Sequence, residues 1–182
     1  MVGKNQQVSV ERYDAESDYD FEPFDCGIEH LNQFLKSRMH KEADKGLLVP
    51  YLCFYLNDEG KKEVIGYFTL SSGSIEKAAL RVRPRRDVTY STVPCILLGR
   101  LAVCQSVQGQ GLGKFLLGKA ILQSLVSSKA IGVYAIALRA EEHNWPFYLQ
   151  AGFTQSKHHD GKTFFYSLKQ AEQYYKTLAK PR

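Results

Sequence analysis

A strand, a glycine-rich loop and a helix are predicted one after another in the middle of this chain, and this order strongly constrains the fold. Residues 95–103, CILLGRLAV, are short and mostly apolar, which is typical of a buried strand. Three glycines follow within residues 108–113, and residues 114–129 then carry apolar side chains at helical spacing. A second apolar run at residues 131–138, IGVYAIAL, predicts another strand. A helix between two strands favours parallel pairing of those strands.

The segments on either side of this unit predict antiparallel hairpins. Residues 47–56 and 63–75 predict strands around a good hairpin turn at residues 57–60, NDEG. Residues 153–168 predict two more strands around the Asp160-Gly161 turn. This mixed order favours an α+β fold over a doubly wound nucleotide-binding fold. Further expected elements are a strand at 8–13, a helix after Asp25 that this residue could cap, an exposed loop or broken helix at 76–93, a helix at 143–150 ended by Gly152, and a helix or frayed tail at 170–179.

The composition is that of an ordinary globular protein. Hydrophobic residues make up 44% of the chain and charged residues 24%, which excludes wholesale disorder. A chain of 182 residues without repeats or linkers fits one domain, so we expect residues 1–182 to form a single domain. No apolar run approaches the roughly 18 residues needed to cross a bilayer. The first seven residues lack the pattern of a secretory signal, so a cytoplasmic protein without membrane contact is expected.

The cysteines indicate structural roles. The chain has four of them, and they show no CxxC pair and no Cys/His spacing typical of zinc sites. Each lies beside apolar residues, as a buried small hydrophobic residue would. We therefore expect no metal and four structural cysteines, which are Cys26, Cys53, Cys95 and Cys104.

Two clusters of basic residues account for much of the formal net charge of +5. One is the segment RVRPRR, with four arginines in six residues, and the other lies on and after the predicted N-terminal helix. Such clusters usually face solvent, but they also suit a polyanion such as the phosphates of CoA or RNA. Both interpretations stay open from charge alone. The clusters consist of Arg81, Arg83, Arg85 and Arg86, and of Lys36, Arg38, Lys41 and Lys45.

The glycine-rich loop, QGQGLGK, predicts a phosphate site, because glycines let the backbone approach a ligand and the following helix presents unpaired N–H groups. A Walker loop is excluded, since Gly113-Lys114 is followed by Phe115 instead of Ser or Thr. The dinucleotide fingerprint GxGxxG is excluded as well, since it needs glycine where Lys114 stands. The pattern Q/R-x-x-G-x-G/A fits at every position, with Gln108, Gly111 and Gly113.

That pattern resembles the acetyl-CoA loop of the GNAT N-acetyltransferase family. A second likeness lies one helix and one strand later, in residues 147–153, FYLQAGF, where the family has F/L-Y followed by Gly-Phe. The resemblance implies a GNAT fold: a mixed, mostly antiparallel sheet with a central strand–glycine loop–helix–strand unit and helices on both faces. It also implies acetyl-CoA as co-substrate, without a metal. The residues implied in cofactor binding are Leu101, Val103, Gln108, Gly109, Gln110, Gly111, Leu112, Gly113, Lys114, Asn144 and Phe147.

Within that family the chain is similar to toxin acetyltransferases of the TacT/AtaT type. The likeness covers residues 24–153 and includes FDCGIEHLNQFLK, GYFTLSSGSI, the RVRPRR segment and LLGRLAV. It implies acetylation of the α-amino group of aminoacyl-tRNA, and neutralisation by a small ribbon-helix-helix antitoxin. Arg81, Arg83, Arg85 and Arg86 are then the candidate tRNA contacts. A homodimer is left open. Two departures are Cys104, where such sequences often have Asp, and Trp145-Pro146 before the Phe-Tyr pair.

The resemblance also assigns chemical roles. Tyr148 is the candidate general acid that protonates the leaving CoA sulfur. The backbone N–H of Val103, on a strand that the family splays open, is the candidate hydrogen-bond donor to the thioester carbonyl. No general base stands out, since Glu141, Glu142 and His143 are typical of a solvated loop. An α-amine has a pKa of about 7.7 to 8, so part of it is neutral at pH 7, and such an acceptor needs a base less than lysine does.

Three functions therefore stay open on the sequence. The first is acetylation of aminoacyl-tRNA, as the resemblance implies. The second is acetylation of a small-molecule amine or a protein amine by the same fold. The third is a non-catalytic acyl-CoA sensor, against which the presence of Tyr148 argues.

Overall fold

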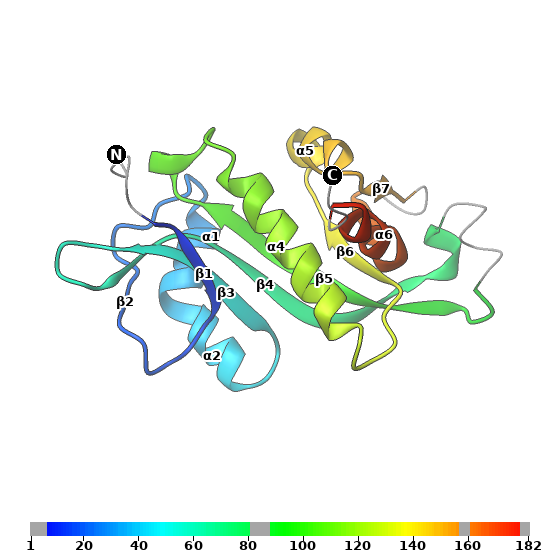
Figure 1. Ribbon diagram of the computed structural model, residues 1–182, viewed down its shortest axis with the longest axis horizontal. Helices are drawn as coiled ribbons and strands as arrows, with labels where there is room; N and C mark the ends of the chain where they lie inside the picture. The colour runs from blue at the N-terminus through cyan, green and yellow to red at the C-terminus, as the bar shows by residue number, and fades with distance from the viewer. Residues whose placement is uncertain (1–6, 81–87, 157–160, 179–182) are drawn as a thin grey trace. The chain divides into compact units, whose positions relative to one another are not determined.

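The structure is a computed structural model that describes residues 7–80, 88–156 and 161–178 (Figure 1). It divides into two compact units. Unit 1 combines Met1–Ser71 with Gly99–Gly118, and unit 2 combines Ser72–Leu98 with Lys119–Arg182. The expectation of a single domain stays a prediction.

Unit 1 contains the predicted early hairpin. Strand β3 (Val49–Leu56) pairs antiparallel with β1 (Ser9–Arg12) on one side and with β4 (Lys62–Glu76) on the other. The two-residue β2 (Tyr19–Asp20) pairs parallel with the start of β4. The turn between β3 and β4 is closed by the N–H of Asn57, which donates to the Lys61 carbonyl at 2.9 Å. Gly60 has a φ of 78°, which glycine adopts without strain, so the predicted hairpin is confirmed.

The N-terminal helical region of unit 1 is irregular. It consists of α1 (Glu29–Gln33), a π-helical turn (Phe34–Arg38) and α2 (Met39–Asp44). The prediction that Asp25 caps this helix is wrong, because Ile28 occupies the N-cap position. Asp25 instead accepts hydrogen bonds from the N–H of Gly27 at 2.8 Å and from Asn32 Nδ2 at 2.7 Å. A turn thus separates Asp25 from the helix.

The core of unit 1 packs the helical region and the start of α4 (Leu112–Ser127) against β4. The Tyr67 ring stacks with Phe34, and its hydroxyl donates to the Leu31 carbonyl at 2.9 Å. Gly66 lies where a Cβ would come within 2.8 Å of Leu116 and 3.2 Å of the Ala102 carbonyl. A glycine at this position therefore lets the helix and the neighbouring strand approach β4 closely.

Unit 2 contains the first part of the predicted strand–helix–strand unit, the second part of its helix, its second strand and the late hairpin, whereas residues 99–118 belong to unit 1. Strand β5 (Thr92–Val103) pairs parallel with β6 (Ala135–Arg139), and α4 lies between them in the chain. Strand β8 (Thr163–Ser167) pairs antiparallel with β6 and with β7 (Thr154–Gln155). The strand pairs are thus mixed and mostly antiparallel, which confirms the α+β class. The other helices are α5 (Trp145–Gln150), α6 (Leu168–Leu178) and short 3-10 turns at Lys77–Ala79, Gln105–Val107 and Glu142–Asn144.

The core of unit 2 corrects one expectation. Residues 76–93 were expected to form an exposed loop or broken helix, but Leu80, Val88 and Val93 are buried, and they pack in one cluster with Cys95 and Phe165. The apolar ends of this segment pack against the sheet because burial removes them from water. Residues 81–87 lie outside the described residues.

The expectation of buried, structural cysteines is confirmed, because all four are buried and none forms a disulfide. In the described part of the chain, no group of His, Cys, Asp or Glu side chains could hold a metal ion. No helix in the described ranges is long and apolar enough to cross a membrane.

Candidate active site

Unit 1 presents a row of free backbone N–H groups where β5 leads into α4. Within the described residues, the six N–H groups of residues 109–114 donate no hydrogen bond to the protein. Gly109 and Gly111 have φ values of 75° and 86°, in the left-handed region that favours glycine. Helix α4 begins at Leu112, so its first N–H groups lack an intrahelical acceptor and lie at the positive end of the helix dipole. This arrangement suits a phosphate or diphosphate.

Gln108 differs from the other residues of the predicted loop. Its N–H donates to the Gln105 carbonyl at 3.2 Å, because the 3-10 turn before it ends there, so this N–H is not free. The side chain makes the contacts instead. Its Nε2 donates to the Val103 carbonyl at 2.9 Å and to the Cys26 carbonyl at 3.1 Å. Gln108 therefore joins the loop to the end of β5 and to the turn before α1.

Among the described residues, no strand pairs with one edge of the end of β5. Pairing with β6 involves only Cys95, Ile96 and Leu97. The N–H of Cys104 donates to the Ile65 carbonyl of β4 at 2.8 Å, and the backbone N–H and C=O groups of successive residues in a strand face opposite sides. The polar groups of Val103 therefore face away from β4, in agreement with the contact between its carbonyl and Gln108. Leu101 and Val103, both half-buried, share this edge, and their role toward a thioester stays a prediction.

Tyr148 lies in unit 2, on α5, within a cluster of aromatic rings. Its ring lies 5.0 Å from that of Phe147, 5.8 Å from Phe153 and 6.1 Å from Phe164, centroid to centroid. Burial raises the pKa of Tyr148 above its ordinary value, so the phenol keeps its proton at neutral pH. Among the described residues its hydroxyl has no hydrogen-bond partner, which leaves the proton available to a ligand. This is the state that a general acid requires.

The neighbours of Tyr148 have structural contacts. Trp145 Nε1 donates to the Ala140 carbonyl at 3.0 Å and its ring packs against Phe164, so this residue has a packing role. Phe147 is half-buried against the Tyr148 ring. Asn144 is exposed at the start of α5, and its amide contacts the His143 ring at 3.0 Å. The predicted cofactor contacts of Asn144 and Phe147 stay predictions.

The three polar residues that precede α5 do not form a base. Glu141, Glu142 and His143 are all exposed. Glu141 accepts a hydrogen bond from Lys162 at 2.6 Å, and this partner lowers the pKa of its carboxyl group. A carboxylate held in its charged form is a weaker base, so Glu141 is a poor candidate for deprotonating an amine.

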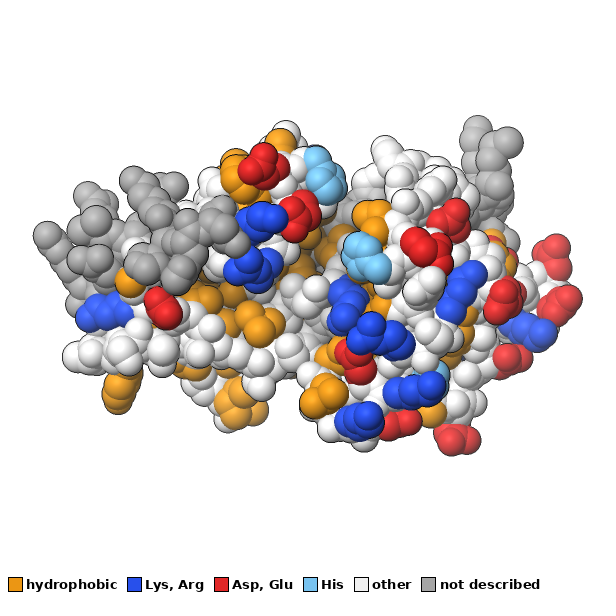
Figure 2. Space-filling model, turned by 180° about the vertical axis from the view of Figure 1, so that it is seen from behind, with side chains coloured by type: hydrophobic (Ala, Val, Ile, Leu, Met, Phe, Trp, Pro, Cys, Tyr) orange, Lys and Arg blue, Asp and Glu red, His pale blue; other side chains and the backbone are white. Residues whose placement is uncertain are grey.

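The two basic clusters differ in what the structure describes. The four arginines at positions 81, 83, 85 and 86 lie outside the described residues. The second cluster lies on the helical region of unit 1, and Figure 2 shows Lys and Arg side chains over that region. Arg38 is paired with Glu42 at 2.9 Å. Lys41 and Lys45 are exposed and, among the described residues, form no ion pair, so they present positive charge to solvent.

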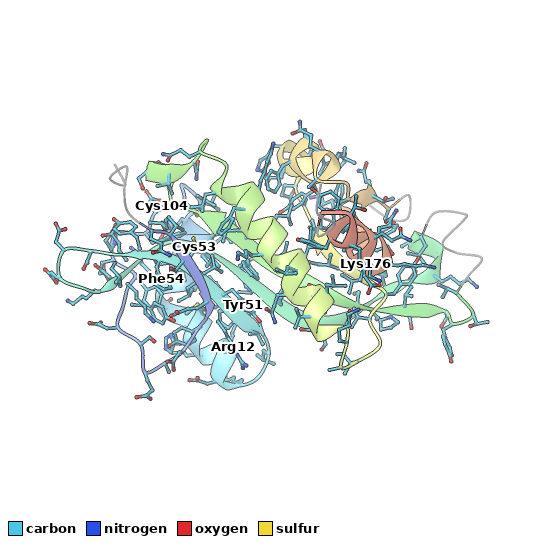
Figure 3. The ribbon with its side chains drawn as sticks, viewed as in Figure 1. Arg12, Tyr51, Cys53, Phe54, Cys104 and Lys176 are labelled. Atoms are coloured by element: carbon cyan, nitrogen blue, oxygen red, sulfur yellow. The ribbon has the colours of Figure 1, made fainter. Side chains whose placement is uncertain are left out.

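The loop before α1 is a part of the site region that local sequence patterns did not predict. The N–H of Gln105 donates to the Asp25 carbonyl at 2.7 Å. Gly27 has a φ of 80°, and a Cβ there would lie 2.4 Å from Gln105 Nε2. Cys104, labelled in Figure 3, is buried beside this link, and Ser106 Oγ donates to its sulfur at 3.3 Å. The sequence signal was Asp-Cys-Gly, an Asp-initiated turn.

The chain between β3 and β7 matches a known family. Residues 50–155, more than half of the chain, match the acetyltransferase (GNAT) domain. This is a class of enzymes with an acyl-CoA loop of the kind described above. The chain therefore belongs to the GNAT acetyltransferase family.

Three proteins with similar sequences or structures can be compared with this chain. A Mycobacterium tuberculosis protein named tRNA-acetylating toxin is 36% identical over 121 residues, which cover 66% of this chain and 69% of that protein. A tyrosine-to-phenylalanine mutant of KacT superposes with a TM-score of 0.87 at 34% identity, covering 93% of this chain and 99% of that one. AtaT complexed with acetyl-methionyl-tRNAfMet has a TM-score of 0.87 at 30% identity and the same coverage.

AtaT has also been solved as a tyrosine-to-phenylalanine mutant bound to acetyl-CoA and to the C-terminus of the antitoxin AtaR. That structure has a TM-score of 0.80 at 27% identity, and the match covers 92% of this chain and 98% of that one. The resemblance to toxin acetyltransferases that the sequence indicated is thus confirmed.

Proposed function

We propose that this chain transfers an acetyl group from acetyl-CoA to the α-amino group of aminoacyl-tRNA, as the toxin of a toxin–antitoxin pair. The observation behind the acetyl-CoA site is the row of six free N–H groups at residues 109–114. The acceptor and the antitoxin follow from the relatives, which include a tRNA-acetylating toxin and AtaT bound to acetyl-methionyl-tRNAfMet and to AtaR. A cytoplasmic location, where charged tRNA is found, belongs to the same proposal.

Three of the predicted groups have defined tasks in this reaction. The N–H groups of residues 109–114 hold the diphosphate of CoA. The N–H of Val103 donates to the thioester carbonyl as negative charge develops on its oxygen. Tyr148 donates its proton to the sulfur of the departing thiolate, which its raised pKa permits because the phenol is fully protonated at neutral pH.

The acceptor amine must reach the site without its proton. No well-placed base was found among Glu141, Glu142 and His143. An α-amine with a pKa of about 7.7 to 8 is partly neutral at pH 7, whereas a lysine amine with a pKa of about 10.4 is almost fully charged. The arrangement therefore suits an α-amine better than a lysine side chain.

A transfer assay with labelled acetyl-CoA tests the proposal. The protein is incubated with charged tRNAs, uncharged tRNAs and a mixture of small amines, and the label is followed into each pool. We expect label only in charged tRNA. Label in small amines independent of tRNA would support metabolite acetylation instead, and tight acetyl-CoA binding without any transfer would support a sensor.

The basic surface gives a second test of the acceptor. If phosphate contacts hold the tRNA, raising salt from about 50 to 200 mM should lower affinity by tenfold or more. Replacement of Lys41 and Lys45 by Gln should reduce the slope of log affinity against log salt by about one for each lysine that neutralises a phosphate. An unchanged slope in this double variant would show that these lysines do not contact the tRNA. Filter binding with charged tRNA measures both quantities.

A further inference from the structure

The Gln108 side chain links the end of β5 with the first residue of the glycine loop. Both hydrogens of its amide nitrogen are used, one by the Val103 carbonyl at 2.9 Å and one by the Cys26 carbonyl at 3.1 Å. This sets the orientation of the amide, because a flipped group would place Oε1 against two carbonyl oxygens. The side chain is therefore held in one orientation, although the residue is exposed.

The peptide group that Gln108 contacts is held from both ends. The Val103 carbonyl accepts from Gln108, and the N–H of the same peptide group, that of Cys104, donates to the Ile65 carbonyl at 2.8 Å. The Val103 N–H lies on the same open edge of β5 as the Val103 carbonyl. Fixing the carbonyl therefore also restricts the direction of the N–H that we assign to the thioester.

We propose that Gln108 is a positioning residue for acetyl transfer. The inference assumes the proposed function, in which residues 109–114 hold the diphosphate and Val103 contacts the thioester. The part of CoA between its diphosphate and its thioester has a fixed length when extended. The two sets of N–H groups must therefore keep a fixed spacing, and Gln108 is the only residue of the loop whose side chain, within the described residues, bonds to Val103.

The expected consequence is a loss of turnover and not of cofactor affinity. A donor to the developing oxyanion must lie within a narrow distance range, and a misplacement of about 1 Å can cost about 100-fold in rate. The N–H groups of residues 109–114 do not use the Gln108 side chain, so binding of the diphosphate should persist without it. Gln108 variants should therefore lower kcat at saturating acetyl-CoA.

The decisive variant is Gln108→Glu, with Gln105→Glu as its matched control. Both add one negative charge at exposed positions three residues apart, but within the described residues the Gln105 side chain makes no hydrogen bond. The added charge should weaken CoA binding in both variants, which calorimetry measures, so kcat is compared at saturating acetyl-CoA. Only Gln108→Glu, which replaces two donors by acceptors facing carbonyl oxygens, should lower kcat, by about tenfold or more. Gln108→Arg, which again offers N–H donors to both carbonyls, should recover most of that loss.

The outcomes separate the two proposals. Equal kcat values for the two Glu variants, or a folded Gln108→Arg protein as slow as Gln108→Glu, would overturn the positioning role. Thermal unfolding identifies variants that no longer fold. Gln108→Leu, which has neither charge nor donors, then serves as the second test and should lower kcat without changing the Kd for CoA. Absence of transfer by the unmodified protein would contradict the proposed function itself.

Discussion

The two regions that we assign to acetyl transfer differ in which atoms are proposed to act. In unit 1 the acting groups are backbone N–H groups on an exposed loop, where Gly109 and Gly111 have no side chains and a Cβ at either position would meet nothing within 4 Å. In unit 2 the acting group is one side chain, Tyr148, held among aromatic rings. A backbone site depends on φ and ψ, whereas a side-chain site depends on packing. Substitutions should therefore act by different routes in the two regions.

Removal of the Tyr148 hydroxyl should give the largest effect. In Tyr148→Phe the ring contacts remain but the proton donor is lost, and general acid catalysis contributes about 100-fold or more. We expect kcat to fall by at least that factor, with a Kd for CoA close to that of the unmodified protein. Stopped-flow or steady-state thiol release measures kcat, and calorimetry measures Kd. A variant that retains turnover would remove Tyr148 from the reaction.

The pH dependence of Tyr148 follows from the direction of its pKa shift. Burial raises this pKa above the ordinary value of about 10, so the phenol is protonated at every lower pH. Its ionisation should therefore cause no decline in kcat below about pH 10. A decline of kcat near pH 8 that disappears in Tyr148→Phe would contradict the shift.

Gly111→Ala tests the backbone site, because it changes conformational preference without adding a steric clash. At a φ of 86° alanine is strained by roughly 1–2 kcal/mol, and nothing lies within 4 Å of the added Cβ. We expect CoA affinity to fall about tenfold, since 1.4 kcal/mol corresponds to a factor of ten. The control is Gly118→Ala on α4, which also has open space but a helical backbone.

The control should change stability in the opposite direction. Alanine inside a helix is favoured over glycine by roughly 0.5–1 kcal/mol, so Gly118→Ala should raise the free energy of unfolding by about that amount. Urea denaturation of both variants gives the comparison. If both substitutions leave CoA binding unchanged, the loop does not depend on the left-handed conformation of Gly111.

Phe164→Leu tests the packing of the side-chain site and should have a smaller effect. Phe164 is fully buried, and its ring lies 6.1 Å from the rings of both Tyr148 and Trp145. Leucine is smaller and lacks the ring, so we expect a loss of about 1–2 kcal/mol in the free energy of unfolding. The orientation of Tyr148 should also become less defined, which should lower kcat severalfold. A loss of stability without any change in kcat would show that other contacts orient Tyr148.

The difference between local patterns and contacts of distant segments explains what the sequence could predict. The strand, loop and helix of residues 95–129 and the late hairpin follow from local patterns of apolar residues and glycines, and these predictions were confirmed. Contacts between distant segments could not be predicted in this way. The bond from Gln108 to Cys26 joins residues 82 positions apart, and no local pattern reveals it.

Two errors have a similar origin. Asp25 was expected to cap a helix, but its carboxylate binds Gly27 and Asn32 in a turn, an alternative that the same residue type supports equally well. The flanks of the basic segment were expected to be exposed because of their charged neighbours. Leu80 and Val88 are buried nevertheless, because tertiary packing against the core of unit 2 decides their environment.

Glu141→Gln should have the smallest effect. That result would restrict the proposed catalytic roles to the backbone of unit 1 and to Tyr148 in unit 2. Glu141 is exposed, and its hydrogen bond with Lys162 lowers the pKa of the carboxyl group. If it were the general base, its replacement would lower kcat and shift the acidic limb of the pH–rate profile. Because the structure gives it an ion pair and no buried position, we expect both to stay as in the unmodified protein. A loss of kcat that shrinks toward low pH, where the carboxylate of the unmodified protein would be protonated, would instead identify Glu141 as a third functional element, which acts on the acceptor amine.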